Sequence, residues 1–311
     1  MCDFVHYPWI LFSFLVMLIY ILSRGPQLYS TSRIYKAALG QKHNVRIIDH
    51  MECDLLIEGG VLKVLYQNEI LLKPDVVIPR IGSSATAYGT TVVRHFEEMG
   101  VCVLNSAMSI FSSRDKFRSL QILVRNNIPI PTSYFSFDLH HAETIVQHKL
   151  GYPVIVKVIE GTQGNGVYLV HNEKEATALF DSLASQHTKV ILQEFIKEFK
   201  GKDIRVFVVG DKVVASMLRA ANEGEFRSNL HRGGVGVLVE LSAEEEAMAL
   251  KSAAVLGLSV AGVDILRSKN GPLIIEVNSS PGLEGIEGVT KIEIAESIVD
   301  LAVEKFIQHQ V

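Results

Sequence analysis

Residues 274–284 read IIEVNSSPGLE and begin as an apolar strand that carries two polar side chains, Glu276 and Asn278. Side chains two residues apart on a strand point to the same face, so these two groups lie side by side. Upstream, residues 261–266 (AGVDIL) predict a second apolar strand with a single acid, Asp264. Paired as a hairpin, the two strands can bring two carboxylates and one amide oxygen together on one patch of sheet.

The connection between these strands decides whether Asp264 joins the patch. A three-residue loop over 269–271, with its glycine at the positive φ of a bulge, places Asp264 directly opposite Glu276. A two-residue Asn-Gly turn instead pairs Asp264 with Val277 and points the acid to the other face. In the three-residue register, hard oxygen ligands without Cys or His predict Mg²⁺ or Mn²⁺ shared with substrate phosphates. The alternative interpretation is that the two acids only face solvent.

The composition describes an ordinary globular protein, because 48% of its 311 residues are apolar and 21% are charged. The net charge of −4 provides no basic field that would attract nucleic acid, so no direct nucleic-acid binding is expected. Three widely spaced cysteines, Cys2, Cys53 and Cys102, predict neither a disulfide framework nor a zinc site. They indicate a reducing compartment, and we expect a cytoplasmic protein.

The amino end is unusually apolar, since residues 8–22 contain only one polar side chain, Ser13. This stretch is shorter than the roughly 20 residues that a membrane-spanning helix needs, and it lacks the basic region and cleavage site of a signal peptide. Its second half, Leu18–Leu22, predicts the first buried strand of a parallel sheet. We therefore expect Met17 to be the functional first residue, residues 1–16 to lie outside the fold, and no membrane to be involved.

From residue 18 to residue 104, predicted strands and helices alternate as in a small open α/β domain. Ligands of such sheets bind at the carboxyl ends of the strands, which nominates residues 23–24 and 80–82, against the alternative of ordinary polar loops. The predicted elements, in chain order, are strand 18–22, helix 30–39, strand 45–49, hairpin 53–57 with 61–66, strand 76–79, helix 86–99 and strand 101–104.

The second part of the chain carries a nucleotide-binding pattern. Lys157 interrupts an apolar strand, where a lysine must reach solvent or meet an anion, and a glycine-rich stretch, 160–167 (EGTQGNGV), follows it. Glycines let backbone N–H groups approach phosphate oxygens, although tight hairpins use glycine too. The ending of a P-loop is missing, so we predict a β-hairpin flap over a ligand. Lys116 falls in the first turn of a predicted helix over 114–125.

Two further stretches follow the flap. Glu194 ends an apolar strand over 190–193, and residues 226–234 (FRSNLHRGG) form a polar loop with two arginines. Arginine forks suit carboxylate and phosphate groups, and the alternative is a solvated loop. A helix over 292–308 closes the chain.

Seven motifs together resemble the ATP-grasp ligases, and in detail the RimK family. They are LSRGPQLYS (22–30), IPRIG (78–82), SRDK (113–116), VKVIEGTQGNGV (156–167), FRSNLHRGG (226–234), AGVDIL (261–266) and EVNSSPGLEGIE (276–287). The resemblance runs from about Met17 to the end of the chain. It implies an α/β (α+β) protein in which a pre-ATP-grasp domain over 17–107 precedes an ATP-grasp domain over 108–311, with a lid subdomain at about 131–193.

The resemblance also assigns site residues. Those implied to contact ATP, at its phosphates, adenine, ribose or reacting group, are Lys116, Lys157, Glu194, Phe195, Asp203, Arg227, Ser228 and Asn229. Those implied to hold two Mg²⁺ or Mn²⁺ ions, with the glutamate shared, are Asp264, Glu276 and Asn278. Lys157 and Arg227 are the implied catalytic residues. One departure from similar enzymes is residues 218–220 (LRA), where further charged residues are common.

The activity implied by the resemblance is addition of L-glutamate to the carboxyl terminus of a small-subunit ribosomal protein, through an acylphosphate, by a homotetramer. Transfer of a phosphoryl group to a carboxylate needs positioning and charge neutralisation rather than a nucleophilic side chain. Two alternatives remain: a ligase that joins an amino acid to a small-molecule carboxylate, and a nucleotide-binding regulator without enzymatic activity.

Overall fold

The computed structural model describes residues 15–136, 138–159, 166–186, 188–222, 225–228 and 233–310. The chain divides into two compact units. The first contains residues up to Ile81, residues 87–104 and the carboxyl-terminal residues from Ala295, and the second contains residues 82–86 and 105–294. The domain boundary at 107/108 and the lid range stay predictions. No helix in the described ranges is long and apolar enough to cross a membrane.

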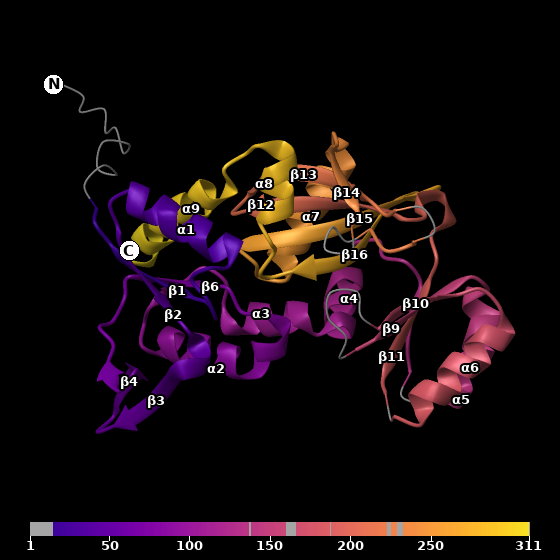
Figure 1. Cartoon of the computed structure of the whole chain (residues 1–311), viewed down its shortest axis with the longest axis horizontal. Helices are drawn as coiled ribbons and strands as arrows, with labels where there is room; N and C mark the ends of the chain where they lie inside the picture. The colour runs from indigo at the N-terminus through magenta and orange to yellow at the C-terminus, as the bar shows by residue number, and fades with distance from the viewer. Residues whose placement is uncertain are drawn as a thin grey trace. The chain divides into compact units, whose positions relative to one another are not determined.

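The first unit is built on a parallel sheet with strand order β2-β1-β6-β7 (Figure 1). The predicted strand Leu18–Leu22 is confirmed as β1, and its last four residues are fully buried, as its apolar sequence requires. The other strands of the sheet are β2 (Asn44–Ile48), β6 (Val76–Pro79) and β7 (Cys102–Val103). The helices of this unit are α1 (Tyr29–Gly40), α2 (Thr86–Glu98) and α9 (Ile294–His309).

The predicted hairpin is confirmed as β3 (Cys53–Glu58) and β4 (Val61–Tyr66), to which β5 (Glu69–Ile70) adds a short third strand. Both turn glycines, Gly59 and Gly60, have positive φ, as a two-residue hairpin turn that matches strand twist requires.

The second unit contains an antiparallel sheet with strand order β10-β9-β11-β8. The strands are β8 (Ser133–Ser136), β9 (Val154–Val158), β10 (Val167–Val170) and β11 (Val190–Glu194). Helices α5 (Leu139–Ile145) and α6 (Glu173–Ala184) lie side by side on one face, where Val156, Phe180 and Leu192 belong to one buried cluster (Figure 1). The pairing of β9 with β10 confirms the predicted hairpin around the glycine-rich stretch, whose residues 160–165 lie outside the described ranges.

A five-stranded antiparallel sheet with strand order β14-β13-β12-β15-β16 forms the rest of the second unit. Its strands are β12 (Lys202–Val209), β13 (Lys212–Ala220), β14 (Val235–Leu238), β15 (Val260–Ser268) and β16 (Gly271–Asn278). The associated helices are α3 (Ala107–Arg114), α4 (Lys116–Arg125), α7 (Ala243–Val255) and α8 (Glu284–Thr290). Alternate residues such as Ile204, Val206 and Val263 pack in one core with Leu123 and Met248 of the helices. The residues between them therefore point to the opposite face.

Two helix predictions need correction. The helix predicted over 114–125 begins only at Lys116, because Asp115 is extended and its side chain accepts a hydrogen bond from the Arg118 N–H at 2.9 Å. Lys116 remains in the first turn, as predicted. The closing helix predicted over 292–308 begins at Ile294, and a separate helix, α8, precedes it.

Candidate active site on the five-stranded sheet

The two predicted acids face each other across neighbouring strands. In the β15–β16 pair, Asp264 lies opposite Glu276 and Gly262 lies opposite Asn278. The predicted juxtaposition is therefore confirmed. The predicted cause is wrong, since the connection is a two-residue turn between the paired residues Ser268 and Gly271.

A β-bulge next to the acids produces the register that the predicted three-residue loop was expected to produce. Ile265 pairs with Ile274 while Asp264 pairs with Glu276, so one residue of β16 has no counterpart. Ile274 and Val277 are three residues apart, yet both are buried in the same apolar cluster. The bulge lets both side chains reach the core while Glu276 points to the opposite face.

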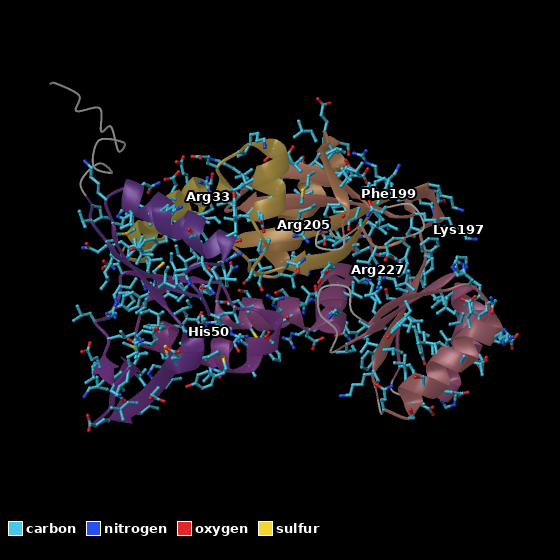
Figure 2. All side chains as sticks on the ribbon, viewed as in Figure 1. Arg33, His50, Lys197, Phe199, Arg205 and Arg227 are labelled. Carbon is cyan, nitrogen blue, oxygen red and sulfur yellow. The ribbon has the colours of Figure 1, made fainter. Side chains whose placement is uncertain are left out.

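Arg205 extends the row of charges onto β12, where it lies opposite Asp264. Its guanidinium donates two hydrogen bonds to this carboxylate, from Nε to Oδ1 at 2.5 Å and from Nη2 to Oδ2 at 2.9 Å. The neighbouring Gly262 makes room for this side chain, because a Cβ there would lie 3.2 Å from Arg205 Nη1 and 2.6 Å from the Cβ of Pro281. Figure 2 marks Arg205 on this sheet.

A second arginine, Arg219 of β13, joins two buried acids. It donates from Nε and Nη2 to the oxygens of Asp203, at 2.6 Å and 2.8 Å, and its Nη2 lies 3.0 Å from Asp264 Oδ2. The Ser228 hydroxyl donates to Asp203 Oδ2 at 2.6 Å. The side chains of Asp203, Arg219 and Asp264 are at most 8% exposed. Arg205, Asp264, Arg219 and Asp203 thus form one chain of alternating charges.

The two acids of this network differ in pKa. Burial raises the pKa of Asp203, and the negative charge of Asp264 acts in the same direction, although Arg219 opposes both. Burial also acts to raise the pKa of Asp264, but Arg205 and Arg219 together outweigh it and hold this pKa below its usual value. Burial acts to lower the pKa of Arg219, and its two carboxylate partners reverse that effect and raise it. Asp264, with two cations, is the more strongly stabilised anion.

The sequence motifs do not include Arg205, and they include Arg219 only within the departure from similar enzymes at residues 218–220. A signal was present, because both arginines have apolar residues on either side of them in their strands, as Lys157 does. A charged side chain in such a strand needs a counter-charge. The partners could not be read from the sequence, because Asp264 is 59 residues from Arg205 along the chain.

The residues predicted to hold a metal are differently engaged. Glu276 is exposed, and the side-chain Nδ2 of Asn278 is buried without a hydrogen-bond partner among the described residues. Asp264 uses three of its roughly four lone-pair positions on arginines, which leaves one on Oδ1. No group of three or more His, Cys, Asp and Glu side chains within the described ranges could hold a metal. Glu276, Asn278 and one oxygen of Asp264 fit a hard cation whose shell is completed by phosphates and water.

The charge of Glu276 acts on two positive side chains, Lys157 and Arg114. Burial lowers the pKa of Lys157, with Glu276 opposing this effect and Lys116 adding to it. Burial likewise lowers the pKa of Arg114, and Glu276 opposes it. Lys116 donates from Nζ to the carbonyl oxygen of Ile159, the residue that follows β9, at 3.2 Å. Asp264 also opposes the lowering of the Lys157 pKa, so the charges of both predicted acids and of Lys116 act on this lysine.

Three of the four remaining residues predicted to contact the nucleotide lie within the described ranges. Glu194 ends β11, and its carboxylate accepts a hydrogen bond from the Thr132 N–H at 3.3 Å, while Phe195 is half-buried. Arg227, which is labelled in Figure 2, donates to both oxygens of Glu225, at 3.0 Å and 2.7 Å. Its guanidinium lies 5.2 Å from the ring centre of Phe226. Asn229 lies outside the described residues.

Comparisons with known proteins cover both parts of the chain. A family model described as "RimK-like ATP-grasp domain" matches residues 113–302, and one described as "RimK PreATP-grasp domain" matches residues 17–110. The chain belongs to the RimK-like ATP-grasp family. This membership confirms the resemblance inferred from the sequence and the predicted fold class, an ATP-grasp fold with a preceding α/β domain.

Relatives of this RimK-like protein carry names that describe an activity. A protein of Nitrosococcus oceani, 48% identical over 91% of this chain and 94% of its own length, is named "Probable alpha-L-glutamate ligase". Proteins of Vibrio vulnificus and Coxiella burnetii, each 49% identical over the same shares, have the same name.

Solved structures share the fold of this RimK-like chain. The ATP-grasp ligase PsnB, complexed with a minimal precursor, superimposes with a TM-score of 0.73 at 19% identity, over 93% of this chain and 99% of its own. D-alanine–D-alanine ligase from Bacillus anthracis superimposes with a TM-score of 0.66 at 19% identity, over 94% and 98%. Another PsnB structure contains Mg and ADP.

Proposed function

We propose that this protein is an ATP-dependent ligase that adds L-glutamate to the carboxyl-terminal carboxylate of a small-subunit ribosomal protein. The observation that supports this proposal best is the row of Arg205, Asp264 and Glu276 across three neighbouring strands. The charges of Glu276, Asp264 and Lys116 all act on Lys157. Oxygen ligands beside several cations suit a substrate rich in phosphate. The choice of glutamate as the amino-acid substrate rests on the names of the relatives.

The chemistry needs an activated carboxylate, because a carboxylate is a poor electrophile. We propose that the γ-phosphoryl group of ATP passes to the acceptor carboxylate, which forms an acylphosphate and releases ADP. The amine of glutamate then attacks the acyl carbon, and phosphate leaves as the amide bond forms. Residues of the chain contribute by positioning and by neutralising charge, as in other phosphoryl transfers.

Each predicted residue has a proposed role in this reaction. Glu276, Asn278 and the remaining lone pair of Asp264 would hold the divalent ions, two by the family resemblance, with Glu276 shared. When bound, Mg²⁺ or Mn²⁺ would neutralise charge on the transferring phosphoryl group. Lys157 and Lys116 would bind phosphate oxygens during the transfer.

The loop after residue 224 would supply a third phosphate contact. Arg227 is held by Glu225 in this structure, and we propose that it exchanges this carboxylate for a phosphate oxygen when ATP binds. Glu194 and Phe195 would contact adenine. We keep Asp203 among the proposed nucleotide-binding residues, because its carboxylate accepts a hydrogen bond from Ser228, the neighbour of Arg227. Asn229 completes the proposed set by resemblance alone.

Incubation with ATP, Mg²⁺, glutamate and a peptide that ends as the ribosomal protein does would test the function. Mass spectrometry should show the peptide gaining mass in steps of one glutamyl residue, with one ADP released per step. If ADP forms only with a small carboxylic acid and the peptide mass stays fixed, the protein is a small-molecule ligase. Light scattering would test the proposed homotetramer, and fractionation of the host cell the proposed cytoplasmic location.

A further inference from the structure

Asn105 is a buried asparagine, 2% exposed, whose side chain uses both of its donors and accepts twice. Its Oδ1 accepts hydrogen bonds from the N–H groups of Ser259 and Val260, at 2.8 Å and 3.0 Å. Its Nδ2 donates to the carbonyl oxygens of Val260 and Ser279, at 2.8 Å and 2.9 Å. A carboxamide can satisfy two N–H groups and two carbonyls from one position, whereas a carboxylate only accepts.

These four bonds tie together the ends of the two strands that carry the candidate metal ligands. Val260 is the first residue of β15, which carries Asp264, and Ser279 directly follows Asn278, the last residue of β16. Asn105 therefore links the start of one ligand-bearing strand to the end of the other. It lies 155 residues from Val260 and 174 from Ser279 along the chain, so the sequence does not indicate this connection.

The side chains at the end of β16 do not fix this segment themselves. Asn278 Nδ2, Ser279 Oγ and Ser280 Oγ are all buried and have no hydrogen-bond partner among the described residues. The Ser279 carbonyl, by contrast, is held by Asn105. The backbone contact with Asn105 is thus a specific polar restraint on a turn whose own side chains supply none.

We infer that Asn105 is a positioning residue for the metal site, an inference that rests on the proposed metal-binding role of Asp264, Glu276 and Asn278. Mg²⁺ requires near-ideal octahedral geometry at about 2.0–2.1 Å. The ligands must be held to within about 0.5 Å for such a site to work. By fixing the Ser279 carbonyl against the start of β15, Asn105 holds Asn278 at the correct distance from Asp264.

Two substitutions test this inference, Asn105→Asp and Asn105→Ala. Asn105→Asp replaces the donor that faces two carbonyls by an oxygen, and it adds a negative charge that by itself would favour cation binding. We expect both variants to bind Mn²⁺ about 10–100-fold more weakly, the range typical for residues that support metal ligands. The Mn²⁺ dissociation constant is measured by electron paramagnetic resonance with and without ADP, whose phosphates can complete the shell of the proposed ion. Weaker binding by the aspartate variant would show that geometry outweighs charge.

Hydrogen–deuterium exchange of metal-free protein provides a second measurement. Amides in residues 277–282 should exchange faster in both Asn105 variants than in the wild type. Glu245→Gln is the matched control, because it weakens an ion pair in which the exposed Arg267, at the other end of β15, donates to the buried Glu245 carboxylate at 2.6 Å and 2.9 Å. At a temperature where all variants are folded, this control should leave Mn²⁺ binding and exchange of 277–282 unchanged. Equal effects in the control and the Asn105 variants would mean that stability alone is involved.

The test separates this inference from the metal site on which it rests. If wild-type protein binds no Mn²⁺ either with or without ADP, or if Glu276→Gln binds it unchanged, the metal site is wrong. If Glu276→Gln loses binding while both Asn105 variants bind as the wild type does, only the positioning role is wrong. Should neither Asn105 variant fold, NMR of the wild type decides. The side-chain amide of Asn105 should then shift on Mg²⁺ titration with the same midpoint as the Ser279 N–H, and a constant shift would overturn the inference.

Discussion

Replacing Arg219 by methionine should destabilise the second unit and change how its stability depends on pH. The substitution removes the guanidinium that bridges Asp203 and Asp264, while Asp264 keeps both of its bonds to Arg205. Asp203 keeps only the Ser228 hydroxyl. Removing one partner of a buried ion pair costs about 3–5 kcal/mol, because the other charge is left uncompensated. Arg219→Lys, which keeps the charge but not the two-pronged geometry, should cost about 1–3 kcal/mol.

The loss in Arg219→Met should shrink as pH falls. The pKa of Asp203 is already raised by burial, and it rises further when Arg219 is removed. A carboxyl group whose pKa is higher in the folded state binds protons more readily when folded, so stability falls as pH rises. The uncompensated charge of Asp203 therefore destabilises the variant most at pH 8. The destabilisation is much smaller at pH 5, where Asp203 is protonated more readily. Asp264 has the opposite effect, because its pKa is lowered in the folded state. It stabilises the fold at pH values above its unfolded pKa of about 4.

Urea unfolding followed by circular dichroism at pH 8 and pH 5 measures both effects. Arg125→Met is the matched control, because Arg125 is exposed in the last turn of α4, and its cost should be at most about 0.5 kcal/mol. A cost of Arg219→Met below about 1 kcal/mol at pH 8 would refute the argument that the network is buried and coupled. So would a cost that grows from pH 8 to pH 5.

Three further predictions concern the site. Glu276→Gln should change the free energy of unfolding by at most about 0.5 kcal/mol, because Glu276 is exposed, while turnover at saturating Mg²⁺ falls about 100-fold or more. Gly262→Ala should lower the urea midpoint by the equivalent of about 1–3 kcal/mol, because its Cβ would lie 2.6 Å from the Cβ of Pro281. Glu225→Gln should lower the KM for ATP, since Arg227 is then released from its carboxylate partner. Because the hydrogen bonds from Arg227 lower the pKa of Glu225 to about 2, this effect should be constant from about pH 5 to pH 8.

Each of these three has a contrary outcome. Near wild-type turnover of Glu276→Gln would remove this residue from the metal site. An unchanged urea midpoint for Gly262→Ala would mean that Pro281 and Arg205 can move apart without cost. A raised KM for Glu225→Gln would show that Glu225 positions Arg227 for ATP instead of competing with it.

Local patterns determined the elements of this protein and the types of its site residues. The apolar run of Leu18–Leu22 was sufficient to predict β1, and the two-residue spacing of Glu276 and Asn278 placed both on one face of β16. Such properties depend on neighbours along the chain, through burial and the alternation of strand residues. The order of Lys157, the glycine-rich stretch and the acids also indicated the family.

Tertiary structure alone decided which charges meet. The pairing of Asp264 with Glu276 comes from a bulge beside Ile274, where two apolar side chains must both reach the core, and not from the turn that the sequence suggested. The partners of Arg219 and the four bonds of Asn105 join residues 16 to 174 positions apart. Strand order and register set these meetings, and both depend on packing the whole apolar face of the sheet, which no short segment contains.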